Sequence, residues 1–145
     1  MKISTKGRYA LRLMLDLAEN GKDNFVALKD IAERQRISKK YLEQIVPLLN
    51  KSGALRTNRG YQGGYMLAKS PSEYTVGSIL RITEGSLAPV SCLETETNLC
   101  ERSETCITLS LWKGLYKVVN EYLDSITLQD MIDENHERMI DEYYI

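Results

Sequence analysis

The sequence predicts a mainly α-helical fold with one small β-hairpin, and three observations lead to this prediction. Apolar residues recur every three or four positions along most of the chain, which is the period of an amphipathic helix. Two short extended segments, 54–58 and 64–69, are joined by a connection that contains Gly60 and Gly63. Residues 1–69 carry 14 Lys or Arg and 6 Asp or Glu, whereas residues 70–145 carry 5 and 14. Together these features predict a winged helix-turn-helix followed by a long dimerisation helix.

The first two helices are predicted over residues 5–20 and 28–35. The apolar face of the first consists of Leu11, Met14, Leu15 and Ala18. Gly21 is suited to end this helix, and Ile31 and Ala32 face inward in the second.

A third helix is predicted to begin after Ser38, which is a good N-cap, and to end at Ser52 and Gly53. Its inward positions are Leu42, Ile45 and Leu49. We expect a bend at Pro47, because proline lacks the N–H donor and crowds the preceding turn. Such a bend would leave the first turns free to lie in a groove.

The second half is predicted to contain two helices and an irregular stretch before a short final helix. Thr75 caps a helix that runs to about residue 83, and residues 85–105 show no periodicity. A long helix is predicted over residues 107–126, with an apolar stripe wide enough to bind another chain. The stripe consists of Leu109, Trp112, Leu115, Tyr116, Val119, Tyr122, Leu123 and Ile126. Thr127 and Asp130 begin the short last helix, and an acidic tail follows from Asp133.

These segments divide the chain into three predicted parts. Residues 1–84 form a winged helix-turn-helix that binds DNA, residues 85–106 form a cysteine-bearing loop, and residues 107–145 form the dimerisation helix and acidic tail. A basic first half suits a polyanion, because each neutralised phosphate releases counterions.

The third helix carries the candidate residues for reading DNA, since the first turns of a recognition helix reach base edges in the major groove. Together with the turn before it, this segment supplies Arg36, Ser38, Lys39, Lys40, Tyr41, Glu43 and Gln44. Glu43 can accept a hydrogen bond from cytosine N4, and Gln44 can pair with adenine N6 and N7.

Other basic residues are predicted to contact the DNA backbone and the minor groove. Arg36, Lys39 and Lys40 suit phosphates, which position a protein without specifying sequence. Arg59 at the tip of the wing suits a narrow minor groove, and Gly60 beside it permits a close approach of the backbone.

The sequence gives no support for an enzyme or a membrane protein. His136 is the sole histidine and is expected to be solvated, and no nucleophile lies beside a base. No apolar run is long enough to span a membrane, and the N-terminus lacks a signal-peptide core, so we expect a cytoplasmic protein.

Three motifs resemble one family of small winged-helix transcription regulators. They are Met1-Lys-Ile-Ser-Thr-Lys-Gly-Arg-Tyr9, Ser38-x-x-Tyr41-Leu-Glu-Gln44 and Arg59-Gly-x-x-Gly-Gly-Tyr65, and the similarity continues through Leu111-Trp112 and Ile126-Thr-Leu128. The family includes the iron–sulphur cluster regulator (IscR), the nitric-oxide-sensing repressor (NsrR) and the cysteine-metabolism repressor (CymR). The resemblance implies a homodimer joined by the long helix on a palindromic operator, with base readout by Glu43 and Gln44 and minor-groove contact by Arg59.

Cys92, Cys100 and Cys106 match the place where cluster-binding members of this family carry three thiolates. The resemblance therefore implies an iron–sulphur cluster, such as a 2Fe-2S cluster, because thiolates are soft anionic donors. The usual fourth ligand is missing, since Leu109 stands where IscR has histidine and Arg8 stands where NsrR has aspartate. Glu94, Glu101, Glu104, an external thiol or a residue of the partner subunit could take that place; thiol redox switching, a zinc site and inert thiols remain alternatives.

The C-terminus favours an alternative to the iron–sulphur cluster regulator. The chain ends Glu142-Tyr-Tyr-Ile145, and cysteine-metabolism repressors have a similar aromatic-aromatic-Ile ending. The resemblance implies that Ile145 could bind cysteine synthase and that the protein could be a cluster-free repressor of cysteine or sulphur metabolism. A third reading is a protein–protein adaptor without DNA binding.

Overall fold

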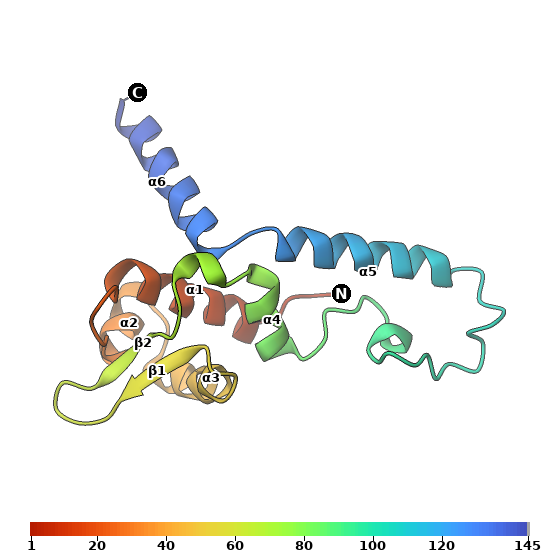
Figure 1. The fold of residues 1–145 in the computed structure, drawn as a ribbon, viewed down its shortest axis with the longest axis horizontal. Coiled ribbons are helices and arrows are strands. Elements are labelled where there is room, and N and C mark those ends of the chain that lie inside the picture. Colours follow the sequence, from red (N-terminus) through yellow and green to blue (C-terminus); the bar gives the residue numbers. More distant parts are fainter. Residues whose placement is uncertain (145) are drawn as a thin grey trace.

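The computed structural model describes residues 1–144, which form six α-helices and one two-stranded antiparallel sheet at the edge of the molecule (Figure 1). The elements in chain order are α1 (Thr5–Asn20), α2 (Leu28–Gln35), α3 (Lys39–Lys51), β1 (Leu55–Asn58), β2 (Gly64–Leu67), η1 (Pro71–Glu73), α4 (Val76–Glu84), η2 (Ser91–Leu93), α5 (Leu109–Asp124) and α6 (Leu128–Tyr144). This order confirms the predicted winged helix-turn-helix followed by a long helix. No helix among the described residues is long and apolar enough to cross a membrane.

Side-chain caps explain why several helix starts could be predicted. Ser38 accepts a hydrogen bond from the Tyr41 N–H at 3.1 Å, and Thr75 accepts one from Ser78 at 3.0 Å. Each cap satisfies a backbone donor that the first turn leaves without a helical partner. The helix α3 continues through Pro47 as one α-helix.

The main core lies between the first four helices and the hairpin. Its fully buried side chains include Leu13, Met14, Leu17, Ile31, Leu42, Ile45, Leu49, Ile79 and Leu128. Leu128 opens α6, so the last helix contributes directly to the core of the N-terminal half. A smaller cluster of Val76, Leu80 and Leu87 packs against Tyr116, Leu123 and Ile126 of the α5 region.

The hairpin is shorter than predicted. Leu55 pairs with Leu67 and Asn58 with Gly64, so the strands cover 55–58 and 64–67. Ala68 still donates a hydrogen bond to the Ala54 carbonyl, but the Lys69 N–H turns to the Tyr74 hydroxyl at 3.0 Å. The ladder therefore ends before Lys69.

The predicted apolar stripe of α5 was wrong in part. Tyr116, Leu123 and Ile126 pack against the protein's own body, so they are not free to bind another chain. The exposed apolar residues are Leu111 (61%), Leu115 (38%), Val118 (62%) and Tyr122 (63%), at intervals of four, three and four residues. That spacing is the heptad pattern of a helix pair, and we call this set the α5 outer stripe. The helix itself covers 109–124 rather than 107–126.

The last helix is much longer than predicted. The α6 helix has 17 residues and includes most of the segment expected to be a tail. Thr127 and Asp130 form reciprocal hydrogen bonds at 2.9 and 3.0 Å, which cap its start as expected. It continues because the segment contains three Glu and two Met, which favour a helix, and neither glycine nor proline. Figure 1 shows its C-terminal turns leaving the body.

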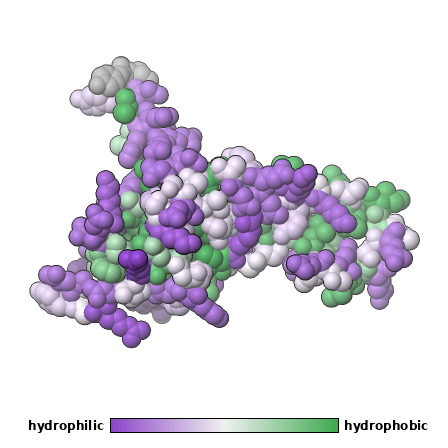
Figure 2. Space-filling model, viewed as in Figure 1, coloured by the Kyte–Doolittle hydropathy of each residue, from purple (hydrophilic) through white to green (hydrophobic). Residues whose placement is uncertain are grey.

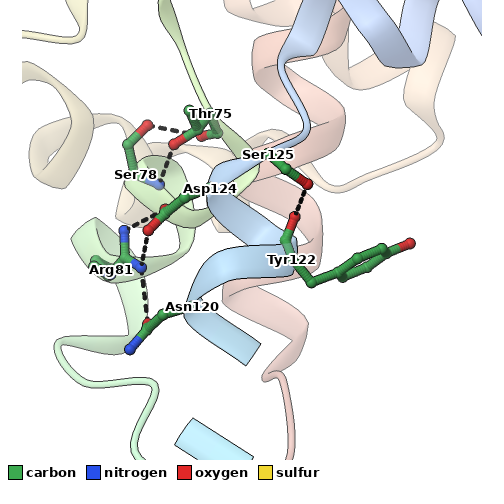
Figure 3. A network of polar contacts seen from close by, with 7 residues as sticks. All are labelled: Thr75, Ser78, Arg81, Asn120, Tyr122, Asp124 and Ser125. Carbon is green, nitrogen blue, oxygen red and sulfur yellow. Dashed lines mark hydrogen bonds and ion pairs between the residues drawn. The ribbon is translucent and has the colours of Figure 1, made fainter. Parts of the chain in front are cut away.

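A polar joint fixes α5 to α4 (Figure 3). Arg81 donates to both carboxylate oxygens of Asp124, at 2.7 and 2.9 Å, and to Asn120 Oδ1 at 2.8 Å. This pairing lowers the pKa of Asp124 and raises the pKa of Arg81. Gly77 allows the approach, because a Cβ there would collide with the Asp124 carboxylate. Two backbone hydrogen bonds, Val76 N–H to Ile126 C=O and Leu128 N–H to Tyr74 C=O, complete the joint.

Candidate DNA-binding surface and cysteine loop

The first turns of α3 present a polar surface. Lys39, Lys40, Glu43 and Gln44 are exposed, while Leu42 and Ile45 on the other side are fully buried. The alternation follows from the helical period, because residues three and four apart share a face. The side chains predicted to contact DNA are therefore available to a partner.

A buried carboxylate holds the helix-turn-helix together. Asp16 on α1 is 2% exposed and accepts hydrogen bonds from Arg34 Nε and Nη2, at 3.0 and 2.7 Å, and from Gln35 Nε2 at 3.0 Å. The hydrogen bonds that Arg34 donates to Asp16 raise the pKa of the Arg34 guanidinium. Because Arg34 and Gln35 are in the last turn of α2, these bonds fix the residues that lead into α3.

The turn between α2 and α3 depends on an unusual backbone conformation. Arg36 has a φ of 54°, in the left-handed region, and its side chain is exposed. Its position directly before Ile37 and the cap Ser38 places it beside the start of the recognition helix. Ile37 is buried and anchors the turn to the core.

Tyr41 has a structural contact that the sequence did not reveal. Its ring meets Tyr9 of α1 edge to face, with ring centroids 5.3 Å apart, and the Arg12 guanidinium lies 5.2 Å from the centre of the Tyr9 ring. Tyr41 is half-buried. The stack therefore joins the first turn of α3 to α1.

Lys39 and Glu43 form an ion pair one turn apart on α3. Their charged atoms are 4.0 Å apart, and their side chains are 58% and 55% exposed. An exposed ion pair of this kind contributes little free energy, so either side chain can readily bind another partner. Glu43 can therefore leave Lys39 for another hydrogen-bond donor.

The wing tip contains Arg59 and Gly60, both exposed. Gly60 has a φ of 123°, which an L side chain rarely adopts, and its carbonyl accepts a hydrogen bond from Gly63 at 3.0 Å. Close to this loop, β2 is attached to the connection between α1 and α2, since Val26 and Tyr65 exchange two backbone hydrogen bonds of 2.8 Å. Arg59 thus sits on a tight loop supported by the body.

Recognition helix and wing lie on the same side of the protein. In Figure 1, α3 and the hairpin occupy one side, and α5 and α6 leave from the other. Figure 2 shows hydrophilic side chains over the wing in this view, whereas hydrophobic patches gather at the projecting end of α5. The arrangement can offer a helix and a cationic loop to two adjacent grooves of a duplex.

The cysteines lie on the loop between α4 and α5. Cys92 is in η2, Cys100 is exposed, Cys106 precedes α5, and all three are free thiols. Cys106 Sγ lies 3.4 Å from Thr108 Oγ1, and this hydrogen bond lowers the pKa of the thiol. Within residues 1–144, no three Cys, His, Asp or Glu side chains gather closely enough to hold a metal ion. The donor type fits iron, but the structure does not bring these thiols together.

Several residues that fix the helices relative to one another were not predicted from the sequence. Asp16 interrupts an apolar helix face, which is the signal that could have singled it out, whereas the partners Arg34 and Gln35 look like ordinary surface residues. Arg81 and Asp124 are far apart in the chain, and no local pattern relates them.

A helix-turn-helix with an exposed recognition helix, a basic wing and an outward apolar stripe on α5 is typical of a DNA-binding transcription regulator. The family described as Rrf2, iron-dependent transcriptional regulator, matches residues 3–134. The chain belongs to this family, whose members are regulators rather than enzymes and bind DNA as dimers.

Individual relatives with names in this family are similar to the chain over most of its length. IscR of Pectobacterium carotovorum is 37% identical over 141 residues, 97% of this chain and 84% of the relative. CymR of Bacillus subtilis is 40% identical over 131 residues, 90% of this chain and 89% of the relative. Among solved structures, T. potens IscR has a TM-score of 0.76 at 41% identity, covering 95% of this chain and 90% of that one.

Proposed function

We propose that two copies of this chain bind a palindromic operator through α3 and the wing. The single observation that carries this is that α3 and the hairpin lie on the same side of the protein (Figure 1), with Glu43, Gln44 and Arg59 exposed on them. Glu43 and Gln44 read base edges in the major groove, and Arg59 enters the minor groove with Gly60 allowing the approach.

The neighbouring side chains position the duplex. Arg36, Lys39 and Lys40 neutralise phosphates, and Ser38 orients the first turn of α3 through its cap. Tyr41 contributes by holding that turn to α1 and by offering its hydroxyl to the backbone of the DNA. We assign DNA binding to residues 1–84, signal reception to 85–106 and dimerisation to 107–145.

The α5 outer stripe is the proposed dimer contact. Leu111, Leu115, Val118 and Tyr122 lie on the side of α5 away from the body, so a second α5 can cover them. Burial of apolar area gives about 25 cal/mol per Å² and is the main source of stability for such a helix pair.

Selection of operators from random duplex DNA tests the DNA-binding proposal. We expect a palindrome to be enriched, and its affinity to fall as salt rises because several phosphates are neutralised. Enrichment of no sequence, or binding that ignores salt, would contradict it.

For the signal, we propose that Cys92, Cys100 and Cys106 hold an iron–sulphur cluster of the 2Fe-2S kind. The chemistry of three thiolates on one loop supports this, as do relatives of the iron-dependent regulator family. Such a group would supply an oxidant-sensitive iron centre. Glu94, Glu101, Glu104, an external thiol or a partner residue would complete the ligand set, and the loop would have to close around it.

Anaerobic purification with iron and sulphide analysis tests the cluster. Serine at each of the three cysteine positions should lower the iron content, while Ser103→Ala on the same loop should not. Colourless protein that takes up no iron on reconstitution would remove the proposal and leave thiol redox switching.

A second candidate is a cluster-free regulator of cysteine metabolism. It is favoured by similarity to the structure described as CymR, the global cysteine regulator of B. subtilis, which has a TM-score of 0.75 at 37% identity, covering 92% of this chain and 98% of that one. In this proposal Ile145, which lies outside the described residues, binds cysteine synthase. Deletion of residues 143–145 should then abolish binding to that enzyme without changing operator affinity.

A further inference from the structure

A groove between α1, α2 and α6 is large enough for a small molecule. Its volume is about 530 Å³, within the range of about 300–1,000 Å³ typical of ligand sites. The apolar part of its lining comes from Leu15, Met131 and Ile132, of which Ile132 is buried. An apolar floor supplies affinity, while polar groups around it determine which ligand fits.

Charges of both signs surround this floor. Arg12 and Arg138 are the cations, and Glu19 and Glu134 are the acids that line the groove with them. Asp16 also reaches the groove, but Arg34 already neutralises it at 2.7 Å. Balanced charge disfavours a simple anion or cation and favours a ligand that carries both charges.

The two arginines are suited to a carboxylate. A guanidinium offers five N–H donors in a planar fork that matches two carboxylate oxygens. Arg12 uses Nε and Nη2 on Gln35, and Arg138 uses Nη2 on Asn135 at 2.8 Å, so each group retains further donors. Glu134 and Glu19 offer oxygens to an ammonium group, although His136 lies 3.9 Å from Glu19 at the edge.

One wall of the groove is part of the helix-turn-helix. Gln35 is the last residue of α2; its side-chain oxygen accepts from Arg12 Nε at 3.3 Å, and its amide donates to Asp16 at 3.0 Å. The Gln35 backbone carbonyl also accepts from Arg12. A ligand that draws Arg12 away would loosen the residue directly before the turn into α3. The opposite wall is α6, which follows α5 after a short connection.

We propose that this groove binds a small zwitterion, a free α-amino acid, and that its occupancy changes the affinity of α3 for DNA. The carboxylate binds the arginines, the ammonium binds Glu134 or Glu19, and the side chain lies on Leu15, Met131 and Ile132. The change in DNA affinity rests on the proposed operator binding, whereas the binding of the amino acid does not.

Calorimetric titration of the full-length protein with each proteinogenic α-amino acid, without DNA, tests the site. The variants Arg138→Gln and Glu134→Gln each remove one charge from the groove, and Glu137→Gln on α6, which does not line the groove, is the matched control. All three side chains are exposed, so unfolding in urea should be unchanged. We expect at least one amino acid to bind the wild-type protein. At least one groove variant should bind it about tenfold or more weakly, which is equivalent to about 1.4 kcal/mol. The control should bind it as tightly as the wild type.

Absence of binding by every amino acid up to millimolar concentration would overturn the site, as would binding equal in all three variants and the wild type. Operator affinity measured with and without the amino acid tests the coupling; an unchanged affinity would overturn that part alone. Failure of the wild-type protein to bind any operator would instead count against the DNA-binding proposal, because the titration is performed without DNA.

Discussion

Asp16 accepts two hydrogen bonds from Arg34, at 2.7 and 3.0 Å, although its neighbours on α1 form the apolar core. The side chain of Asp16 is 0% exposed and that of Arg34 is 40% exposed. The pair therefore lies at the boundary between core and solvent, where it joins α1 to the end of α2. Removal of either partner leaves a polar group poorly satisfied.

Asp16→Asn should lower the free energy of unfolding by about 2 kcal/mol, less than the roughly 3–5 kcal/mol for a fully buried pair because Arg34 is partly screened by water. Urea unfolding measures this, with Glu33→Gln on the exposed side of α2 as the control. Equal stability of the two variants would mean that Asp16 does not hold the helices together.

Glu43→Ala should relax base preference at one operator position by about 1–3 kcal/mol. The reason is that Glu43 is proposed to accept a hydrogen bond from one base, and its partner Lys39 is a weak competitor at 4.0 Å. Binding to a panel of single-base operator variants measures the change. Glu137→Ala on α6 should leave every position unaffected.

Arg59→Ala should instead weaken binding to all operator variants and reduce its dependence on salt, because the proposed wing contact is largely electrostatic. The same panel, repeated at several salt concentrations, tests this. Uniform loss of affinity in both Glu43→Ala and Arg59→Ala would contradict the division of roles between α3 and the wing.

Val118→Glu should convert the dimer to monomer, since it introduces a charge at the centre of the α5 outer stripe, where Val118 is 62% exposed in a single chain. Sedimentation velocity measures the change. Lys113→Glu also alters charge on an exposed position of α5 but lies off the stripe, and it should remain dimeric. A dimeric Val118→Glu protein would show that another surface joins the subunits.

Asp124→Asn should destabilise the protein at neutral pH and matter less in acid. Arg81 lowers the pKa of Asp124 in the folded state, so the contribution of the pair is present above the ordinary Asp pKa. It is lost as the pH falls through the lowered folded-state value. Urea unfolding of wild type and variant across this acid range should converge; a difference that grows as pH falls would give the wrong sign.

Local chemistry made most of the fold predictable. Ser38 and Thr75 are capping residues that determine helix starts whatever the tertiary packing, so those boundaries agree with the structure. The exposed positions of α3 followed equally from the helical period. Neither result required knowledge of distant contacts.

Features that depend on long-range packing could not be predicted from the sequence. The face of α5 that meets the body depends on Arg81, 43 residues from Asp124, so periodicity alone assigned Tyr116 and Leu123 to the wrong surface. The length of α6 was missed because its acidic surface is typical of both a solvated helix and a tail. Tyr41 was treated only as a DNA contact, since its partner Tyr9 lies on another helix.

The joint of Arg81, Asn120 and Asp124 affects the spacing of the operator half-sites that the proposed dimer would bind. It fixes each DNA-binding unit to the C-terminal end of α5, so in a dimer the separation of the two α3 helices depends on the register in which the α5 helices pair. Each residue of register is worth about 1.5 Å along the helix, whereas successive major grooves on one face of B-DNA are about 34 Å apart. Under the proposed pairing, half-site spacing is encoded in α5, separately from the bases that α3 is proposed to read.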